Sequence, residues 1–446
     1  MNFGDHVRSV HAGGALVVQP RMGMADPALM RAGLEAVERA DADTVGTITL
    51  DSYTRTGDLE SVRAALRDGV DLNGYPIVNY PAAVTRGVVA GLAERGFPVQ
   101  VRHGSARPLH IFGALLDAGL HATEGGPVSY CLPYGRTPLD ESVRNWEASC
   151  ELAAEYAAER GVRPHLETFG GCMLGQLCPP SQLVAISVLE AVFFRDLGIR
   201  SLSLSYAQQT DPGQDAEAIG ALRALAGRLL PDADWHVVVY AYMGVYPRTV
   251  AGANALLAAA ARLAVDTGSE RLIVKTSVES SRIPTVQHNV DALEYAAAVA
   301  RDRRRQLAGP GAPAAAPADG TDSQVYREAA ALVAAVLDGV GTGGVGGALV
   351  GAFKRGLLDV PYCLHPDNAG RSRSYLDEAG RLCWSELGGM PLQGIAPVRP
   401  GRRITSGDLT KALCHVQDRF DAVALDRGAD RPVGAAEHEI LEGKPA

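Results

Sequence analysis

The sequence predicts an α/β protein whose core is a (β/α)8 TIM-type barrel, followed by a C-terminal extension of helical and irregular structure. Short apolar runs alternate with stretches of helical periodicity, a pattern that favours repeated βαβ units and a parallel sheet. The alternation continues from about residue 15 to about residue 300, the length of a typical barrel. Polar and charged side chains follow several of the apolar runs. An open, doubly wound sheet is the alternative fold.

Nine segments have the composition of β-strands, one more than a closed barrel needs. They are residues 15–18, 44–50, 76–79, 98–101, 121–124, 164–167, 201–206, 235–242 and 271–275. The weakest is 76–79, which we interpret as an extended segment near the site. The intervening segments predicted as helices are 26–40, 59–68, 84–95, 141–160, 180–197, 215–230 and 250–266.

The sequence also predicts how the domains are organised. Residues 1–302 form the barrel, and residues 303–323, rich in proline, alanine and glycine, form a surface linker. Residues 324–446 form an extension that packs on the barrel and contains a helix over 325–340.

Composition excludes several classes of protein. Of the 446 residues, 47% are hydrophobic and 21% charged, as in ordinary enzymes, and the net charge of −9 argues against binding to nucleic acid or anionic membranes. Residues 1–14 lack the features of a signal peptide, and no apolar run is long enough to span a bilayer. The seven cysteines form no C-x-x-C pair. We therefore expect a cytoplasmic protein with free thiols and no metal ligands.

Three arginines follow the first strong strand candidates: Arg21, Arg55 and Arg102. If these strands are parallel neighbours, the three guanidinium groups converge at one mouth of the sheet. Guanidinium makes planar, charged, bidentate contacts with carboxylate or phosphate. The set therefore indicates an anionic substrate with more than one acidic group. The alternative is three unrelated arginines on the surface.

Other polar residues follow later strand candidates. Glu124, Tyr130 and Tyr134 come after one, Glu167 and Phe169 after the next, and Lys275 and Glu279 after the last; the carboxyl ends of barrel strands carry active sites. Three arginines anchor two carboxylates in this interpretation, and Glu124 accepts an ammonium group. The pattern favours an acidic amino acid held at both ends. The alternatives are ordinary packing for the tyrosines and a turn role for Glu124.

Six short motifs stand in order along the chain. They are Gln19-Pro20-Arg21-x-Gly23, Asp51-x-Tyr53-Thr54-Arg55, Leu72-Asn73-Gly74-x-Pro76-x-Val78-Asn79, Arg102-His103-Gly104, Glu124-Gly125-Gly126-x-x-Ser129-Tyr130-x-x-Pro133-Tyr134 and Val274-Lys275-Thr276-x-x-Glu279-x-x-x-Ile283-Pro284. Together they resemble the large (epsilon) subunits of coenzyme-B12-dependent glutamate mutase, also called methylaspartate mutase. The resemblance covers about residues 15–300 and extends to 357–370.

The resemblance implies a (β/α)8 barrel that encloses the substrate. Adenosylcobalamin would lie between this barrel and a separate small (sigma) subunit, whose D-x-H-x-x-G histidine is the lower cobalt ligand. It implies a homodimer of this chain within a heterotetramer. The implied reaction is a radical carbon-skeleton rearrangement that interconverts L-glutamate and L-threo-3-methylaspartate. In this chain Asp234-Trp235-His236 matches only the start of that motif, with Val239 in place of glycine, so we expect no cobalamin ligand here.

The resemblance also assigns residues to roles. Arg21, Arg55 and Arg102 match the arginines that hold the substrate carboxylates, and Glu124 matches the glutamate at the substrate amino group. Tyr130 and Tyr134 match hydrogen-bonding tyrosines, and Phe169 matches a packing residue beside the substrate. The positions expected around the cofactor are Gly23, Asn73, Pro133, Lys275 and Glu279.

Two alternatives remain from the sequence. One is a non-catalytic relative that binds an acidic amino acid or serves as a scaffold for a partner. The other is a B12-dependent mutase with a different amino-acid substrate. The intact set of arginines with Glu124 argues against both. Residues 205–209 and 242–249 depart from the family pattern, which bears on subunit contacts and fine selectivity.

Overall fold

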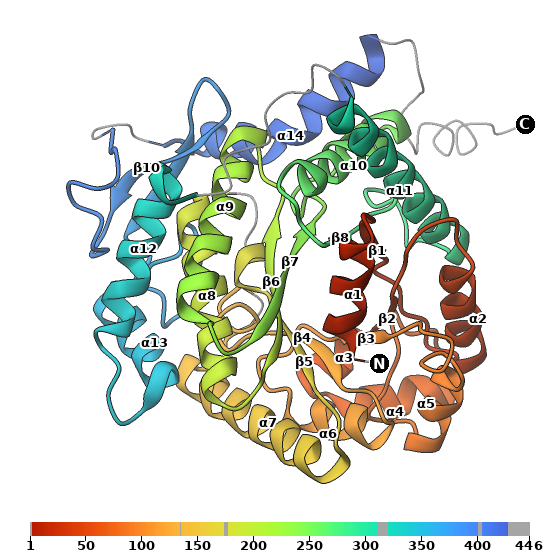
Figure 1. The fold of residues 1–446 in the computed structure, drawn as a ribbon. Helices are drawn as coiled ribbons and strands as arrows, with labels where there is room; N and C mark the ends of the chain where they lie inside the picture. The colour runs from red at the N-terminus through yellow and green to blue at the C-terminus, as the bar shows by residue number, and fades with distance from the viewer. Residues whose placement is uncertain (1, 134, 174–176, 310–319, 400–403, 427–446) are drawn as a thin grey trace, which may run out of the picture.

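The computed structural model describes residues 2–133, 135–173, 177–309, 320–399 and 404–426 (Figure 1). Eight parallel strands form one sheet in the order β1-β8-β7-β6-β5-β4-β3-β2. They are β1 (Val17–Gln19), β2 (Gly46–Thr49), β3 (Val99–Arg102), β4 (Ala122–Gly125), β5 (His165–Thr168), β6 (Ser201–Ala207), β7 (Asp234–Tyr240) and β8 (Arg271–Ile273). A parallel bridge between Val18 and Thr44 joins the two ends of the sheet. The predicted barrel is confirmed.

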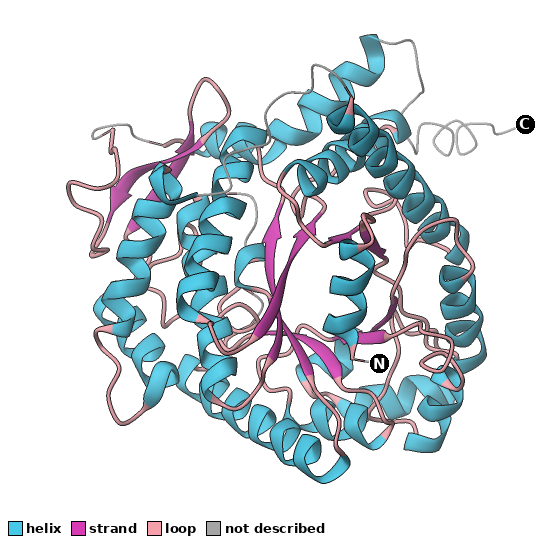
Figure 2. Ribbon diagram, in the orientation of Figure 1, coloured by secondary structure: helices cyan, strands magenta, loops and turns pink. Residues whose placement is uncertain are grey.

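Helices surround the strands on all sides (Figure 2). They are α2 (Pro27–Glu38), α4 (Leu59–Asp68), α5 (Ala82–Val89), α6 (Leu109–Asp117), α7 (Leu139–Arg160), α8 (Pro180–Asp196), α9 (Pro212–Leu229), α10 (Val250–Asp266) and α11 (Val286–Ala308), with the short α3 (Ser52–Thr56) after β2. Residues 77–79 form turns, and 76–79 contain no strand, so the ninth candidate is not part of the sheet. Helix α5 ends earlier than predicted, and Gly91 beyond it has a φ of 76°.

Local sequence signals fix where several helices begin. The side chains of Asp26, Asp58 and Thr249 each accept a hydrogen bond from a backbone N–H in the first turn of α2, α4 and α10. Such caps satisfy amide groups that have no partner within the helix. Gly161 ends α7 in the left-handed conformation that glycine adopts readily. These signals set the connections after the strands, where the predicted site residues lie.

A short N-terminal helix, α1 (Phe3–Ala12), covers the amino end of the barrel (Figure 1). Its Phe3 and Val7 are buried in a cluster with Val17, Val45 and Ala122, which stand at or next to the first residues of β1, β2 and β4. Burial of these side chains removes apolar area from water and anchors the helix. The amino end is therefore closed by α1, opposite the carboxyl ends of the strands.

The chain beyond the barrel packs against its outside. Helix α11 continues to Ala308, so the first six residues of the predicted linker, 303–308, are helical. Residues 310–319 lie outside the described residues. Helix α12 (Gln324–Leu337) then packs on α8 and α9, and α13 (Gly344–Arg355) packs on α7.

The last described elements lie beside the carboxyl face of the barrel. They are the antiparallel hairpin of β9 (Ser372–Leu376) and β10 (Leu382–Leu387) and the helix α14 (Ser406–Asp426). Gln214 in the first turn of α9 exchanges hydrogen bonds with the backbone of Leu382. Asp421 accepts hydrogen bonds from the backbone of Arg248 and Thr249 at the start of α10. Both helix starts follow carboxyl ends of strands.

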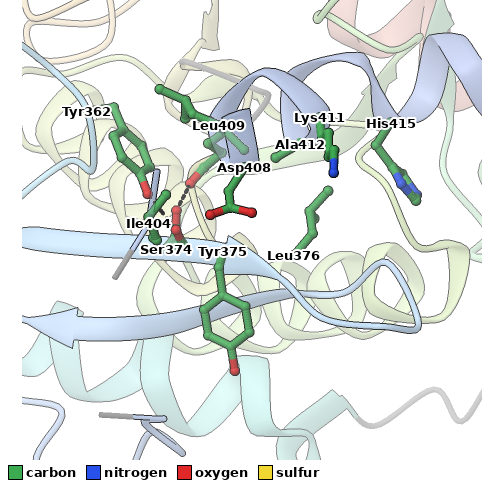
Figure 3. Close-up of a pocket in the computed structure, with 11 residues that line it drawn as sticks. Tyr362, Ser374, Tyr375, Leu376, Ile404, Asp408, Leu409, Lys411, Ala412 and His415 are labelled. Carbon is green, nitrogen blue, oxygen red and sulfur yellow. Dashed lines mark hydrogen bonds between the residues drawn. The ribbon is translucent and has the colours of Figure 1, made fainter. Parts of the chain in front are cut away.

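A cavity of about 160 Å³ separates the hairpin from α14 (Figure 3). Tyr362, Asp408, Lys411 and His415 are among the residues that line it. All seven cysteines are free thiols, as predicted. None of the described helices combines the length and the apolar composition needed to cross a membrane.

Candidate active site

A buried ion pair lies at the carboxyl ends of two neighbouring strands. Arg102 is the last residue of β3 and Glu124 lies in β4, and the arginine Nε is 2.7 Å from the glutamate Oε2. Their side chains are only 5% and 2% exposed. Burial alone would lower the pKa of Arg102, but Glu124, Tyr240 and Tyr130 together outweigh this effect, so the pKa lies well above its ordinary value. Arg102 therefore carries its charge at every accessible pH.

Aromatic residues enclose this ion pair. The Tyr130 hydroxyl donates to the second carboxylate oxygen of Glu124. The ring of Phe169 lies 4.8 Å from that of Tyr130 and 5.6 Å from that of Tyr240, measured between centroids. Tyr130 and Phe169 are 4% and 3% exposed. The structure thus brings together four of the predicted site residues: Arg102, Glu124, Tyr130 and Phe169.

A second ion pair lies deeper in the barrel and is linked to the first by Tyr240. The Tyr240 hydroxyl lies within hydrogen-bonding distance of Glu124 (2.7 Å) and also of Glu167. Glu167 in turn pairs with Arg271, and both side chains are fully buried. Burial raises the pKa of Tyr240 well above its ordinary value, so the phenol keeps its proton. Since it has one proton, it donates to only one carboxylate at a time.

Polar residues from several strands surround Arg271. Its guanidinium donates to the side chains of Gln19 and Ser203, and to His236 Nε2 at 3.4 Å. His236 stacks on His165, with centroids 5.3 Å apart. Burial, with the nearby Arg271 charge, lowers the pKa of both histidines well below the ordinary value. His236 is thus a neutral residue of the barrel interior, with no position at the mouth.

A third group of charges lies where β8 meets β1. Glu279 lies 3.1 Å from the Lys275 ammonium and 3.3 Å from the Arg21 guanidinium. Burial lowers the pKa of Lys275 to about 8, and although Glu279 opposes this shift, Arg21 adds to it. The Lys275 ammonium also lies 5.0 Å from the centre of the Tyr246 ring. Arg21, Lys275 and Glu279, all predicted site residues, therefore form one cluster.

Arg55 and Asn73 lie on the adjacent side of the mouth. Arg55 stands in α3, and its Nη2 donates to Ser52 Oγ at 3.0 Å. Asn73 accepts from the Ser52 backbone N–H at 3.0 Å and donates to Ser52 Oγ at 2.7 Å. Arg55 also packs against Gly104, where an added Cβ would lie 3.2 Å from the arginine Cδ. Ser52 therefore joins two of the predicted residues.

The remaining predicted residues have simpler surroundings. Gly23 lies so close to β2 that an added Cβ would be 2.1 Å from the Thr49 carbonyl oxygen, which explains why a glycine is needed. Pro133 is partly buried in the turns after Tyr130. Tyr134 lies outside the described residues.

The charges of the three groups affect the pKa values of neighbouring residues. The charges of Lys275, Arg21 and Arg102 together outweigh burial and lower the pKa of Glu279. His103, which follows Arg102, has its pKa lowered to about 3 by burial, with contributions from His110, Arg55 and Arg102. All three arginines thus act on groups at the same mouth.

The sequence did not assign roles to several residues of this arrangement. Tyr240, Glu167 and Arg271 form its inner part, and Tyr246 lies against Lys275. A charged residue in an otherwise apolar strand, such as Arg271, was the sequence signal that could have indicated this inner part. Within the part of the chain that the structure describes, no group of three His, Cys, Asp or Glu side chains is arranged to hold a metal ion.

The fold and the site together define a (β/α)8-barrel enzyme with a buried, charged site at the carboxyl face of its barrel. The family model "Methylaspartate mutase E chain (MutE)" matches residues 1–399, and the chain belongs to this family. The family indicates an isomerase of the mutase type.

Relatives named glutamate mutase epsilon subunit can be aligned with most of this chain. The glutamate mutase epsilon subunit of Halobacterium salinarum is 30% identical over 436 residues, which cover 94% of this chain and 88% of that protein. The glutamate mutase epsilon subunit of Yersinia enterocolitica is 28% identical and covers 88% of this chain and 81% of that protein. Among solved structures, the spore coat polysaccharide biosynthesis protein spsE of Bacillus subtilis has a TM-score of 0.37 at 12% identity, covering 68% of this chain and 72% of that one.

Proposed function

We propose that this chain is the large catalytic subunit of an adenosylcobalamin-dependent mutase that interconverts L-glutamate and L-threo-3-methylaspartate. The observation that carries the proposal is the buried Arg102–Glu124 pair, with Tyr130 and Phe169 around it. It places a fixed positive charge beside a fixed negative charge in a water-poor site. An amino acid with acidic groups is the ligand whose charges such a site matches.

In this proposal, the three arginines bind the substrate carboxylates. Arg21, Arg55 and Arg102 come from three different connections at the same face of the barrel. Arg102 donates to Glu124 through Nε and to the Tyr240 hydroxyl through Nη2 at 3.4 Å, so Nη1 is the nitrogen assigned to the substrate carboxylate. Glu124 binds the substrate ammonium group, and hydrogen bonds from Tyr130 and Tyr240 fix the orientation of its carboxylate. A prearranged site of this kind orients the substrate at little cost in entropy.

The residues at the β8 and β1 ends fit the adenosyl group of the cofactor. The hydroxyls of Tyr246 and Thr276 are buried and have no hydrogen-bond partner among the described residues. With Lys275 and Glu279 beside them, these hydroxyls suit a ligand rich in hydroxyl and amino groups. Gly23 and Asn73 complete the proposed cofactor surroundings with Pro133. When bound, adenosylcobalamin supplies reversible hydrogen-atom abstraction, a step that protein side chains do not perform.

The protein's own part is to bind, orient and exclude water. The arginines and Glu124 bind the substrate, and Tyr130 and Phe169 pack around it. Helix α1 closes the amino end of the barrel, and the buried Glu167–Arg271 pair fills its interior. A closed interior protects reactive intermediates from side reactions.

The proposal includes a partner. His236 is enclosed by Arg271 and His165 inside the barrel, so we infer that the lower cobalt ligand comes from a separate small (sigma) subunit. Two copies of each chain would form a heterotetramer. The name "epsilon subunit" of the relatives is consistent with a multisubunit enzyme.

A reconstitution assay tests the proposed function. The purified chain is mixed with adenosylcobalamin and L-glutamate, with and without a small cobalamin-binding subunit, and product is followed by NMR. We expect turnover only when both subunits are present. Turnover by this chain alone would contradict the proposed source of the lower ligand. Absence of turnover with both subunits would favour a non-catalytic relative or another substrate.

A further inference from the structure

Glu190 is a fully buried acid on the helix that follows β5. It lies in the middle of α8, where nearly every residue is buried. Among the described residues it takes part in no ion pair with lysine or arginine. Burial raises the pKa of its carboxyl to about 7, although the hydrogen bonds it accepts oppose this shift. A buried acid without a cation requires other partners.

Those partners come from two different loops at the carboxyl face. In the loop after β4, the backbone N–H groups of Val128 and Ser129 donate to Glu190 Oε1 at 3.3 and 2.9 Å. The Ser129 hydroxyl donates to Oε2 at 3.0 Å. In the loop after β5, the Gly170 N–H donates to Oε2 at 2.9 Å. One carboxylate therefore accepts four hydrogen bonds and ties two loops together.

Two glycines allow the loops to approach the carboxylate. A Cβ added at Gly126 would lie 2.0 Å from the carboxylate carbon of Glu190. A Cβ added at Gly170 would lie 2.5 Å from the Ser187 backbone nitrogen, one turn earlier on α8. A side chain at Gly126 would displace the Glu190 carboxylate, and one at Gly170 would need a shift of α8 or the loop. The two loops are therefore packed directly onto this helix.

Each of the two loops carries a predicted site residue directly beside a residue that contacts Glu190. Ser129 precedes Tyr130, which donates to Glu124, and Gly170 follows Phe169, which packs on the Tyr130 ring. A shift of either loop would move these aromatic side chains relative to Glu124. The site arginines come from other parts of the barrel, since Arg21 and Arg55 follow β1 and β2 and Arg102 ends β3.

We propose that Glu190 is a positioning residue for this enzyme, and that its carboxylate fixes Tyr130 and Phe169 by holding the loops after β4 and β5. The inference rests on the proposed function only for the roles of these two aromatic residues. Its physical basis is that four donors converge on a single acceptor group. Glutamine in its place would present an amide N–H to backbone N–H groups, leaving at least one donor without a partner.

The test compares Glu190→Gln with Glu328→Gln, a control on the far side of α8. Glu328 is also buried on a helix and accepts from Ser181 Oγ at 2.7 Å and from Trp384 Nε1 at 3.0 Å. Both variants replace a buried acid by its amide. We expect kcat of the reconstituted enzyme to fall at least tenfold in Glu190→Gln and less than twofold in Glu328→Gln. The KM for glutamate should change less than threefold in both.

Amide hydrogen exchange on the isolated chain gives a second readout that needs no turnover. In Glu190→Gln the segments 126–130 and 169–172 should exchange at least ten times faster, with α10 unchanged. If this variant does not fold, Ser129→Ala serves instead, because it removes a single donor. For it we expect a two- to fivefold fall in kcat and faster exchange in segment 126–130.

The outcomes distinguish a failure of the positioning role of Glu190 from a failure of the proposed function. Unchanged kcat and unchanged exchange in Glu190→Gln, or in Ser129→Ala where that variant replaces it, would overturn the positioning role. Faster exchange without any change in kcat would overturn it too, since the loops would then be loosened without effect on the reaction. If the unaltered complex shows no turnover, the proposed function fails, and exchange alone decides whether Glu190 holds the loops.

Discussion

The Nε atom of Arg102 lies 2.7 Å from Oε2 of Glu124, in an ion pair between adjacent strands that is almost completely buried. Removing one partner from such a pair leaves an uncompensated charge, so each residue constrains the other. The arginine is held by this contact before any ligand binds. Under the proposed function, substrate binding would need little reorganisation of Arg102.

Arg102→Lys should strongly reduce activity in the reconstituted complex. Lysine keeps the charge but loses the planar fork that contacts Glu124 and Tyr240 and that we propose for a substrate carboxylate. We expect kcat/KM to fall about 10- to 100-fold, equivalent to about 1.4–2.8 kcal/mol for one or two charged hydrogen bonds. Arg144→Lys is the control, because that side chain is 66% exposed in a surface pair with Asp140. Equal activity of the two variants would rule out a specific role for the guanidinium.

Tyr240→Phe should lower both stability and activity. The change removes a hydroxyl that lies within hydrogen-bonding distance of both Glu124 and Glu167, so one buried carboxylate loses its donor and the Arg102 guanidinium loses an acceptor. We expect a loss of about 1–3 kcal/mol in the free energy of unfolding, measured by urea denaturation, and at least a tenfold fall in kcat.

Tyr75→Phe is the matched control for that variant. The Tyr75 hydroxyl is also buried, but its partner is Thr85 Oγ1 at 2.9 Å, outside the charged interior. It should reduce stability by a similar amount and leave kcat of the folded enzyme within about twofold. A Tyr240→Phe variant with normal kcat would show that the inner and outer ion pairs act independently.

The positions of site residues at the carboxyl ends of strands were predictable from the sequence. Arg102 and Glu124 each stand at the carboxyl end of a short apolar run, and parallel strands bring such positions to one face. Their direct pairing was not predicted, because both were assigned to ligand groups. The weakest strand candidate, 76–79, lies outside the sheet, but residues 77–79 form turns where an extended segment was predicted.

Contacts across the barrel interior were not predictable. Tyr240 and Glu167 come from β7 and β5, which do not pair with each other, so only the closed barrel brings them together. Glu190 gave a local signal, as an acid within the apolar stretch of α8, but its partners lie about 20 and 60 residues away. The linker was placed too early because residues 303–306 are all polar and gave no amphipathic pattern, although residues 303–308 continue α11.

Activity should fall as the pH rises above about 8. Burial lowers the pKa of Lys275 to about 8, so its ammonium is charged below this pH and neutral above it. Loss of the charge weakens the contact with Glu279, which carries a negative charge throughout this range because its pKa is lowered. The pH dependence of kcat/KM between pH 6 and 10 should show an alkaline limb near 8.

Lys275→Gln tests the origin of that limb. The amide cannot titrate, so the variant should have low activity that does not change between pH 7 and 9. An alkaline limb that persists unchanged in this variant would assign it to another group.

The substrate should be a dicarboxylic amino acid, because three arginines and one glutamate match two carboxylates and one ammonium. Glutamine lacks the distal charge and would leave one of the three arginines without a substrate carboxylate. A site built around charged donors penalises such an analogue by several kcal/mol, so glutamine should give no product where glutamate gives a measurable rate. Product formation by NMR over glutamate, 3-methylaspartate, glutamine, lysine and 2-methyleneglutarate measures this directly. Rearrangement of glutamine or lysine at the rate of glutamate would mean that Arg21, Arg55 and Arg102 do not bind two carboxylates. If the three arginines bind the carboxylates as proposed, the lysine variants of Arg21, Arg55 and Arg102 should each lose glutamate turnover while keeping the fold.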